Sequence, residues 1–307
     1  MLLTASAATG ALPSSPASAS ASRPTTAPFV EARDGARLYW RSWGEGTPTF
    51  LFDAAWALPS EAWQYQLARL SEAGCRCIPF DRRGHGRSDD PGAGFDMDTL
   101  AGDLAAVIEQ LDLRDLALVG HSLGAAECVR YLTNHGASRV RRLALIAPTT
   151  PCLGRSADNP DGLDPELFQR TRAAFLADFP GIVGANIRPF VDAAMSDRMI
   201  DWIMAMMSST SLQAVLECHR AFTGADFRAE LPKIATPTLI IQGDADVSTP
   251  IALTGSKTAA LLPNCRFEVY PGAPHGLIYT HMDRVTADLL AFARGKQADH
   301  ASRQAEH

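Results

Sequence analysis

A serine flanked by two glycines, in the pattern Gly120-His121-Ser122-Leu123-Gly124, is the first candidate for chemistry in this chain. A serine hydroxyl is a weak nucleophile unless a base takes its proton and a third group orients that base. Its attack on a carbonyl also creates an oxyanion, which needs preorganised hydrogen-bond donors. Because a short pattern of common residues can arise by chance, Ser122 is convincing only if a base, an acid and donors lie in suitable places.

The segments on either side of Ser122 favour a sharp turn from a strand into a helix. Residues 116–120 read Leu-Ala-Leu-Val-Gly, a run typical of a buried strand, and residues 123–136 show helical spacing that ends at a glycine. The glycines at 120 and 124 remove Cβ atoms where the strand and the helix crowd the turn. This context predicts that Ser122 occupies a nucleophile elbow.

Two carboxylates, Asp244 and Asp246, follow an apolar strand expected within residues 236–244. Either one can orient the base while the other caps the turn or contacts solvent. Asp246 is favoured because it lies further beyond the strand end, where the loop can turn back toward Ser122.

The base is expected in the loop after the last strand, where His275 lies between Pro274 and Gly276. The remaining histidines have weaker cases. His121 is expected to pack at the elbow, His85 to be structural within a glycine-rich loop, and His219 to belong to a helical insertion.

Strands alternate with helices along residues 28–150 and again along 232–295, which indicates βαβ units and a mostly parallel α/β sheet covered on both faces. Between them, residues 151–231 have only helical apolar spacing, which predicts a helical cap over the strand ends. The Met-rich part of this cap is either pocket lining or ordinary core. The residues predicted to line a substrate pocket are Trp202, Met206, Met207 and Leu277.

Four blocks of this sequence together resemble the α/β-hydrolase superfamily: FDRRGHGRSD (80–89), LVGHSLGA (118–125), TPTLIIQGDADVSTP (236–250) and YPGAPHGLIYTHMDRVTADLLAF (270–292). They look most like its branch of cofactor-free haloperoxidases, perhydrolases and aryl esterases, over about residues 29–295. The chain order Ser122, Asp246, His275 also matches this superfamily and differs from the orders of chymotrypsin and subtilisin.

The resemblance implies a mostly parallel eight-stranded sheet with the cap inserted after the sixth strand. It implies that Ser122 is the nucleophile and His275 the base, with no cofactor and no metal. In this branch the acid is the last residue of a G-x-x-D pattern, which falls on Asp246.

One segment departs from the family pattern. After the third strand the family usually has His-Gly, whereas this chain has Ala54-Ala55 before Trp56. The oxyanion donors would be the backbone N–H groups of Trp56 and Leu123, which survive a side-chain change if the loop keeps its shape. A glycine-like conformation at Ala55 would be unfavourable, and an Asp53 carboxylate facing the hole would oppose the oxyanion. Strand alternation predicts instead that Asp53 turns into a hydrogen-bonded site beside the hole.

Composition limits the other classes of function. The 307 residues are 46% hydrophobic and 20% charged with a net charge of −6, which gives no electrostatic reason to expect a nucleic acid partner. No stretch has the roughly 20 apolar residues of a membrane span, and the six scattered cysteines contain no C-x-x-C pair. Residues 1–27 are rich in Ala, Ser, Thr and Pro, and 296–307 are a polar tail. The first segment is either a disordered tail of a cytoplasmic protein or, with an upstream start, part of an export signal.

The sequence therefore predicts a serine hydrolase that cleaves small carboxylic esters or lactones through an acyl-enzyme, with possible perhydrolase and haloperoxidase side activity. Haloalkane dehalogenases and epoxide hydrolases are disfavoured because both need an aspartate where this chain has Ser122. Two alternatives stay open: a C–C bond hydrolase of the same fold, and a ligand-sensing protein with slow turnover. The natural substrate and the oligomeric state are not determined by the sequence.

Overall fold

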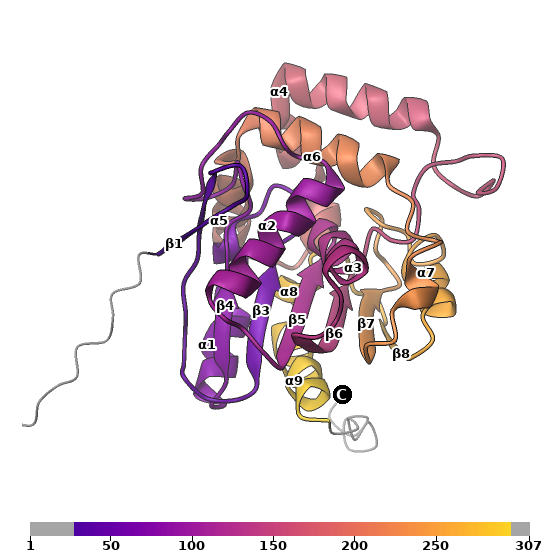
Figure 1. Cartoon of the computed structure of the whole chain (residues 1–307). Coiled ribbons are helices and arrows are strands. Elements are labelled where there is room, and N and C mark those ends of the chain that lie inside the picture. The colour runs from indigo at the N-terminus through magenta and orange to yellow at the C-terminus, as the bar shows by residue number, and fades with distance from the viewer. Residues whose placement is uncertain (1–27, 296–307) are drawn as a thin grey trace, which may run out of the picture.

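The structure is a computed structural model that describes residues 28–295 (Figure 1). The predictions for residues 1–27 and 296–307 lie outside the described residues. Within the described part, no helix is both long enough and apolar enough to span a bilayer.

The centre of the molecule is a six-stranded sheet in which every neighbouring pair of strands is parallel. The strand order is β4-β3-β5-β6-β7-β8, so the chain crosses over repeatedly between strands. The strands are β3 (Thr49–Asp53), β4 (Arg76–Pro79), β5 (Leu116–His121), β6 (Val140–Ile146), β7 (Thr238–Gly243) and β8 (Cys265–Tyr270).

The structure corrects the expected number of eight strands in this sheet. The first two strands, β1 (Phe29–Glu31) and β2 (Arg37–Tyr39), form a separate antiparallel ribbon. Within residues 28–295, the chain after β2 pairs with the β4 segment through isolated bridges and forms no continuous ladder with it. Pro79 explains the interruption, because its carbonyl accepts from the Arg41 N–H at 3.2 Å but proline has no N–H to return the bond.

Helices cover both faces of the sheet and form a three-layer arrangement. Alternate strand residues face opposite sides, so Phe52 and Val119 pack on one face while Leu51 and Leu118 pack on the other. The first face is covered by α1 (Gln64–Glu72), α8 (Leu277–Thr280) and α9 (Met282–Ala293), and the second by α2 (Met97–Gln110), α3 (Leu123–His135) and α7 (Gly255–Leu261). Two 3-10 turns, η1 (Ser60–Trp63) and η2 (Leu231–Lys233), complete the core.

Three helices lie between β6 and β7 in the sequence: α4 (Pro165–Val191), α5 (Asp197–Ser208) and α6 (Leu212–Gly224). Helix α4 is kinked at Asp178, whose backbone is extended and whose side chain accepts from the Gly181 N–H at 2.9 Å. Asp178 thereby caps the helical segment that follows, and Pro180 lies in its first turn, where the missing N–H costs no hydrogen bond. Figure 1 shows α4 and α6 on the side of the sheet toward which the β5 arrow points.

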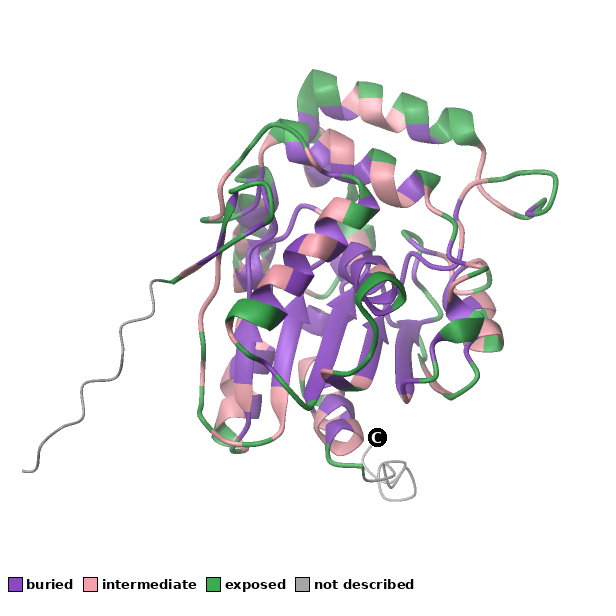
Figure 2. Ribbon diagram, in the orientation of Figure 1, coloured by how far each residue is buried: buried purple, intermediate pink, exposed green. Residues whose placement is uncertain are grey.

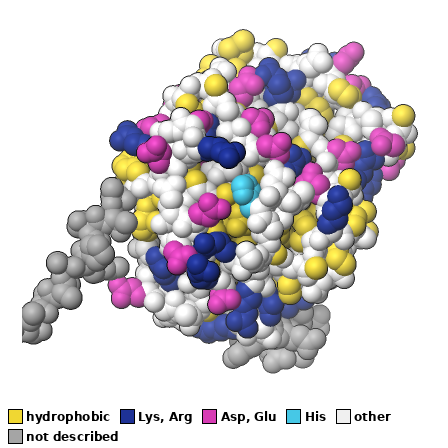
Figure 3. All heavy atoms as spheres, in the orientation of Figure 1, with side chains coloured by type: hydrophobic (Ala, Val, Ile, Leu, Met, Phe, Trp, Pro, Cys, Tyr) yellow, Lys and Arg dark blue, Asp and Glu magenta, His cyan; other side chains and the backbone are white. Residues whose placement is uncertain are grey.

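The central sheet and helix α4 differ in burial. The central strands β3, β5 and β7 are almost wholly buried, whereas the outward face of α4 is exposed (Figure 2). On the face seen in Figure 3, acidic and basic side chains are interspersed. All six cysteines lie within the described residues and all are free.

Candidate active site

Ser122 lies between β5 and α3 in a strained backbone conformation, with φ 57° and ψ −112°. Such values are unfavourable for a residue with a side chain and are found where surrounding structure enforces them. The two flanking glycines explain how the turn is held. A Cβ at Gly120 would collide with the Gly124 backbone, and a Cβ at Gly124 would lie 2.5 Å from the Asp53 carbonyl oxygen. The strand end, the helix start and β3 therefore meet closely at Ser122.

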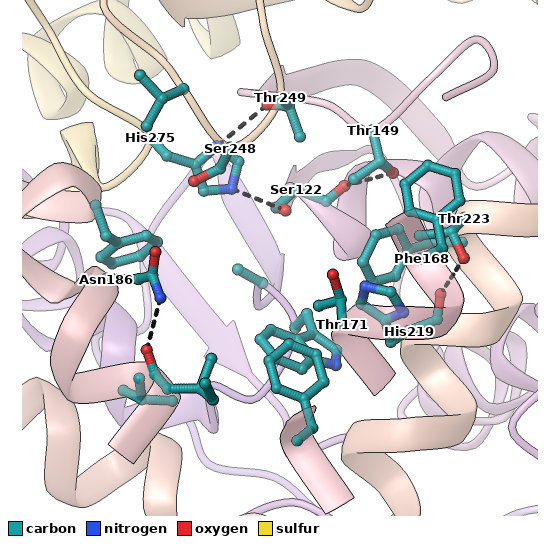
Figure 4. Close-up of a pocket in the computed structure, with 18 of the residues that line it drawn as sticks. Ser122, Thr149, Phe168, Thr171, Asn186, His219, Thr223, Ser248, Thr249 and His275 are labelled. Atoms are coloured by element: carbon teal, nitrogen blue, oxygen red, sulfur yellow. Dashed lines mark hydrogen bonds between the residues drawn. The ribbon is translucent and has the colours of Figure 1, made fainter. Parts of the chain in front are cut away.

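The structure brings Ser122, His275 and Asp246 into one hydrogen-bonded chain. Ser122 Oγ lies 2.9 Å from His275 Nε2, and His275 Nδ1 lies 2.8 Å from Asp246 Oδ2. The three residues are only 4–6% exposed. Because a carboxylate only accepts, Nδ1 carries the histidine proton and Nε2 is left to accept from the serine hydroxyl. Figure 4 shows the Ser122 hydroxyl directed at the His275 ring.

Asp246 is held ionised by a dense set of donors. Its Oδ1 accepts from the Ser248 and Thr249 N–H groups, both at 2.9 Å, and its Oδ2 accepts from the Thr249 hydroxyl at 2.9 Å. Burial alone would raise the pKa of Asp246, but the charge and hydrogen bond of His275, together with the Thr249 donors, bring it below its ordinary value. Asp246 is thus suited to orient His275 and to stabilise its protonated form.

Asp244, the alternative carboxylate, has a different position. It is exposed and accepts from the Gly272 N–H at 2.6 Å, which ties the loop after β7 to the loop after β8. The structure therefore gives the neighbouring aspartates separate tasks, one facing His275 and one joining two loops.

A second histidine supports the backbone of the first. His121 Nε2 lies 3.1 Å from the His275 carbonyl oxygen, so Nε2 carries a proton and donates it. Burial lowers the pKa of His121 to about 3, which keeps the ring neutral. His121 packs at the elbow as expected, and its contact also positions the His275 loop.

Two backbone amides beside Ser122 are free to donate. Within residues 28–295, neither the Trp56 N–H nor the Leu123 N–H has a hydrogen-bond acceptor in the protein. Trp56 lines the same cavity as Ser122, and Leu123 is the first residue of α3. These are the two residues that the sequence predicted as oxyanion donors.

The Ala54-Ala55 segment, which replaces the His-Gly of the family, does not need a glycine-like backbone at Ala55. Ala55 does not have a positive φ among the described residues, whereas Ala57 does, at 59°. Asp53 is 1% exposed and accepts from Arg82 Nη2 at 2.8 Å. As expected, this carboxylate turns into a buried hydrogen-bonded site, and it does not line the cavity.

Ser122 and His275 open onto a cavity of about 500 Å³. Helix α4 contributes much of its wall, so the wall is largely aromatic and aliphatic. None of the described residues that line it is Lys, Arg, Asp or Glu. Polar groups enter at Thr171, Asn186 and His219 (Figure 4).

The predicted pocket residues separate in the structure. Met207 lines the cavity, whereas Trp202, Met206 and Leu277 do not. Trp202 lies on another side of α5, in a separate pocket beside Tyr65. Met206 and Leu277 are packed in the core on the α1 and α9 side of the sheet. The three predictions are wrong because composition alone does not give the rotation of a helix relative to the site.

Sequence reasoning also missed several residues at the site. Thr249 follows Asp246 in an Asp-x-x-Thr pattern, a local turn signal that could have identified it. The cap residues Phe168 and Phe175 had no such signal, since aromatic residues at helical spacing are ordinary core. Among the described residues, no group of three or more His, Cys, Asp or Glu side chains is arranged to hold a metal ion.

Known proteins resemble this chain in sequence and in fold. Residues 48–187 match the family described as alpha/beta hydrolase fold. The chain is 41% identical to a non-heme haloperoxidase of Rhodococcus erythropolis over 86% of this chain and 98% of that protein. It is 34% identical to a bifunctional esterase/perhydrolase of Acinetobacter calcoaceticus over 87% of this chain and 99% of that protein.

A solved esterase from Exiguobacterium antarcticum superimposes with a TM-score of 0.84 at 27% identity, covering 87% of this chain and 98% of that one. These matches cover most of the chain in both sequence and fold, and they identify its family. The protein belongs to the α/β-hydrolase superfamily, in the branch of the non-heme haloperoxidases.

Proposed function

We propose that this protein is a serine hydrolase that cleaves small, uncharged carboxylic esters or lactones through an acyl-enzyme on Ser122. The observation that carries the proposal is the continuous hydrogen-bonded chain from Ser122 through His275 to Asp246, at 2.9 and 2.8 Å, at the floor of an apolar cavity. The relatives named as esterases support the same class of reaction.

In acylation, His275 Nε2 takes the Ser122 proton as Oγ attacks the ester carbonyl. The negative charge that forms on the carbonyl oxygen is stabilised by the Trp56 and Leu123 N–H groups. Asp246 stabilises the imidazolium, which then protonates the departing alcohol. Since both amide donors belong to the main chain, the loss of His-Gly in favour of Ala54-Ala55 leaves this step intact.

In deacylation, His275 removes a proton from water as the water attacks the acyl-enzyme, and then returns that proton to Ser122 Oγ as the carboxylic acid leaves, which restores both residues. Hydrogen peroxide in place of water would give a peracid by the same step. A peracid can oxidise halide in solution, which would account for a haloperoxidase activity as secondary chemistry.

The cavity wall supports uncharged substrates. A buried charge on the substrate would lose its hydration and find no opposite charge among the lining residues. We propose that residues 151–231 act as the cap that provides this wall, with 28–150 and 232–295 as the catalytic core.

The direct test is hydrolysis of p-nitrophenyl acetate by the wild type and by Ser122→Ala. We expect kcat/KM to fall by roughly 10³-fold or more in the variant, because removing the nucleophile of such a unit abolishes its cooperative catalysis. Mass spectrometry of the quenched wild type should find an acetyl group on the peptide that contains Ser122. Ser248→Ala is the matched control, since Ser248 lines the same cavity with its hydroxyl outside the chain of hydrogen bonds.

Full activity in Ser122→Ala would refute the assignment. No turnover by the wild type, together with ligand-dependent shifts in melting temperature, would favour the sensor alternative. Cleavage of a β-diketone in preference to esters would favour the C–C bond hydrolase.

A further inference from the structure

A buried ionic cluster lies directly behind the loop that carries Trp56. Its centre is Arg82, which is 2% exposed. Arg82 Nε donates to Glu127 Oε1 at 2.5 Å, and Arg82 Nη2 donates to Asp53 Oδ1 at 2.8 Å. Neither the cluster nor any charge in it lines the cavity, so the proposed reaction does not use it directly.

The same guanidinium also binds the main chain of the loop. Arg82 Nη2 lies 2.7 Å from the Ala54 carbonyl oxygen, and Nη1 lies 3.4 Å from the Ala55 carbonyl oxygen. The Ala55 carbonyl and the Trp56 N–H belong to one peptide unit. In a trans peptide these two groups point in opposite directions. A carbonyl held toward Arg82 therefore directs the Trp56 N–H away from the cluster, to the side of the cavity.

We propose that Arg82 is a positioning residue of the oxyanion hole, which holds the Ala54 and Ala55 carbonyls so that the Trp56 N–H remains aimed at the reacting carbonyl oxygen. This inference rests on the proposed function, because the direction of that N–H affects catalysis only if Ser122 attacks a carbonyl.

The Ala54-Ala55 segment needs such an anchor because its own side chains provide none. Ala54 and Ala55 carry only methyl groups and cannot form side-chain hydrogen bonds. On the opposite side, the Trp56 indole Nε1 donates to the Val215 carbonyl oxygen of α6 at 2.9 Å. Within the loop, the Leu58 N–H also donates to the Ala55 carbonyl oxygen, at 3.1 Å, whereas the Ala54 carbonyl is bound by Arg82 at 2.7 Å. The loop is therefore held by this turn, by Arg82 from behind and by the Trp56 side chain from the cap.

The cluster places little net charge behind the hole. Asp53 Oδ2 and Glu127 Oε2 are both buried and have no hydrogen-bond partner among the described residues. Burial raises the pKa of each carboxyl group, and that of Glu127 well above its ordinary value, which favours a neutral Glu127 beside an ionised Asp53. Arg82 then balances Asp53, and the oxyanion meets no uncompensated negative charge.

The test compares Arg82→Lys with the wild type on an oxygen ester and on its thionoester. Sulfur is a weaker hydrogen-bond acceptor than oxygen, so a well-aligned hole favours the oxygen ester. A lysine has one point charge and cannot hold both carbonyls and both carboxyl groups. We expect the ratio of kcat/KM for the oxygen ester to kcat/KM for the thionoester to fall about tenfold in Arg82→Lys. This fall is smaller than the roughly 10²-fold or greater loss of rate that follows complete removal of an oxyanion donor.

Because both rates come from one preparation, this ratio is independent of the folded fraction. Arg83→Lys is the matched control, since Arg83 is equally buried and pairs with Asp103 at 2.6 Å without touching the loop. Its ratio should equal that of the wild type. Asp53→Asn should also retain the ratio, since the amide can still accept from Arg82 and donate to an ionised Glu127.

Glu127→Ala tests the inference if Arg82→Lys does not fold. This variant leaves Arg82 paired with Asp53 but removes the acceptor of Arg82 Nε, so the guanidinium can tilt. The ratio of oxygen-ester to thionoester kcat/KM should then lie between the values for the wild type and Arg82→Lys. An unchanged ratio in a folded Arg82→Lys or Glu127→Ala variant would overturn the inference, as would an equal fall in Arg83→Lys. Failure of the wild type to hydrolyse either ester would instead refute the proposed function.

Discussion

The loops at the carboxyl ends of the strands and the cap helix α4 are held together by different kinds of interaction. Ser122, Asp246 and His275 follow β5, β7 and β8 and are almost completely buried, with their polar atoms joined over distances of 2.8–2.9 Å. Helix α4 faces the same cavity with mainly apolar side chains, is exposed on its outer side and is kinked at Asp178.

This difference teaches which properties each region can control. Directional hydrogen bonds between buried groups define positions closely, which suits proton transfer and charge stabilisation. Apolar contacts depend on area and shape with little directionality, which suits discrimination among substrates of different size. We therefore expect changes in the loops to alter rate and changes in α4 to alter selectivity.

The largest effect is expected from Asp246→Asn, with Asp244→Asn as its neighbour and control. An amide at 246 can present its N–H₂ to His275 Nδ1, which would favour the wrong tautomer for accepting the Ser122 proton. We expect kcat to fall by roughly 10³- to 10⁴-fold, the scale measured for the equivalent change in a serine protease. Stopped-flow or steady-state hydrolysis of p-nitrophenyl acetate measures it.

Asp244→Asn should remain within about threefold of the wild type, because its side chain is exposed and still accepts from Gly272. If Asp244→Asn is the more damaging of the two, the acid has been assigned to the wrong residue. Comparable losses in both would mean that the loop fails as a unit.

A smaller effect, on selectivity, is expected from Phe168→Ala in α4. Phe168 lines the cavity and is 9% exposed, so its removal enlarges the space available to the acyl or alcohol group. We expect the preference for hexanoate over acetate esters to rise by about tenfold at most, with kcat for acetate nearly unchanged. A series of p-nitrophenyl esters of increasing chain length measures the shift.

Leu167→Ala is the control, because Leu167 is the adjacent residue on α4 but is 42% exposed and lies outside the cavity lining. A fall in kcat for acetate as large as the change in selectivity would break the proposed division between loops and cap.

The smallest expected effect concerns stability, at His219 of α6. Burial lowers the pKa of His219 to about 4, and the Arg172 guanidinium, whose Nη1 lies 3.3 Å from His219 Nδ1, acts in the same direction. Between pH 6.5 and 4 the unfolded chain thus binds more protons at this residue than the folded protein does. Stability is lost through this group as pH falls across that window.

His219→Gln should remove this loss, because glutamine can still accept from Arg172 and does not titrate. We expect the free energy of unfolding to depend less steeply on pH, by about 1 kcal/mol per pH unit in that interval. Urea unfolding at several pH values measures the slope. An equal slope in the variant and the wild type would contradict a buried, neutral His219.

Features that depend on residues close together in the sequence were predicted correctly, whereas features that depend on packing between distant segments were not. Ser122 was found from five contiguous residues and from the strand and helix around them, because the strained turn needs glycines at fixed positions. Asp246 and His275 were chosen from their loops and chain order, and the structure brings both to Ser122. Trp202 was misplaced because the rotation of α5 depends on packing against distant residues.

The amino-acid sequence by itself determined the α/β class, the turn at Ser122 and the identity of the two side chains that meet it, since each depends on local periodicity, glycine placement or strand order. Only the tertiary structure decided which cap residues line the cavity, that the sheet has six strands, and that Arg82 reaches the Ala54 and Ala55 carbonyls. The physical reason is that these contacts join segments far apart in the chain, where side-chain direction and burial depend on the packing of the whole fold.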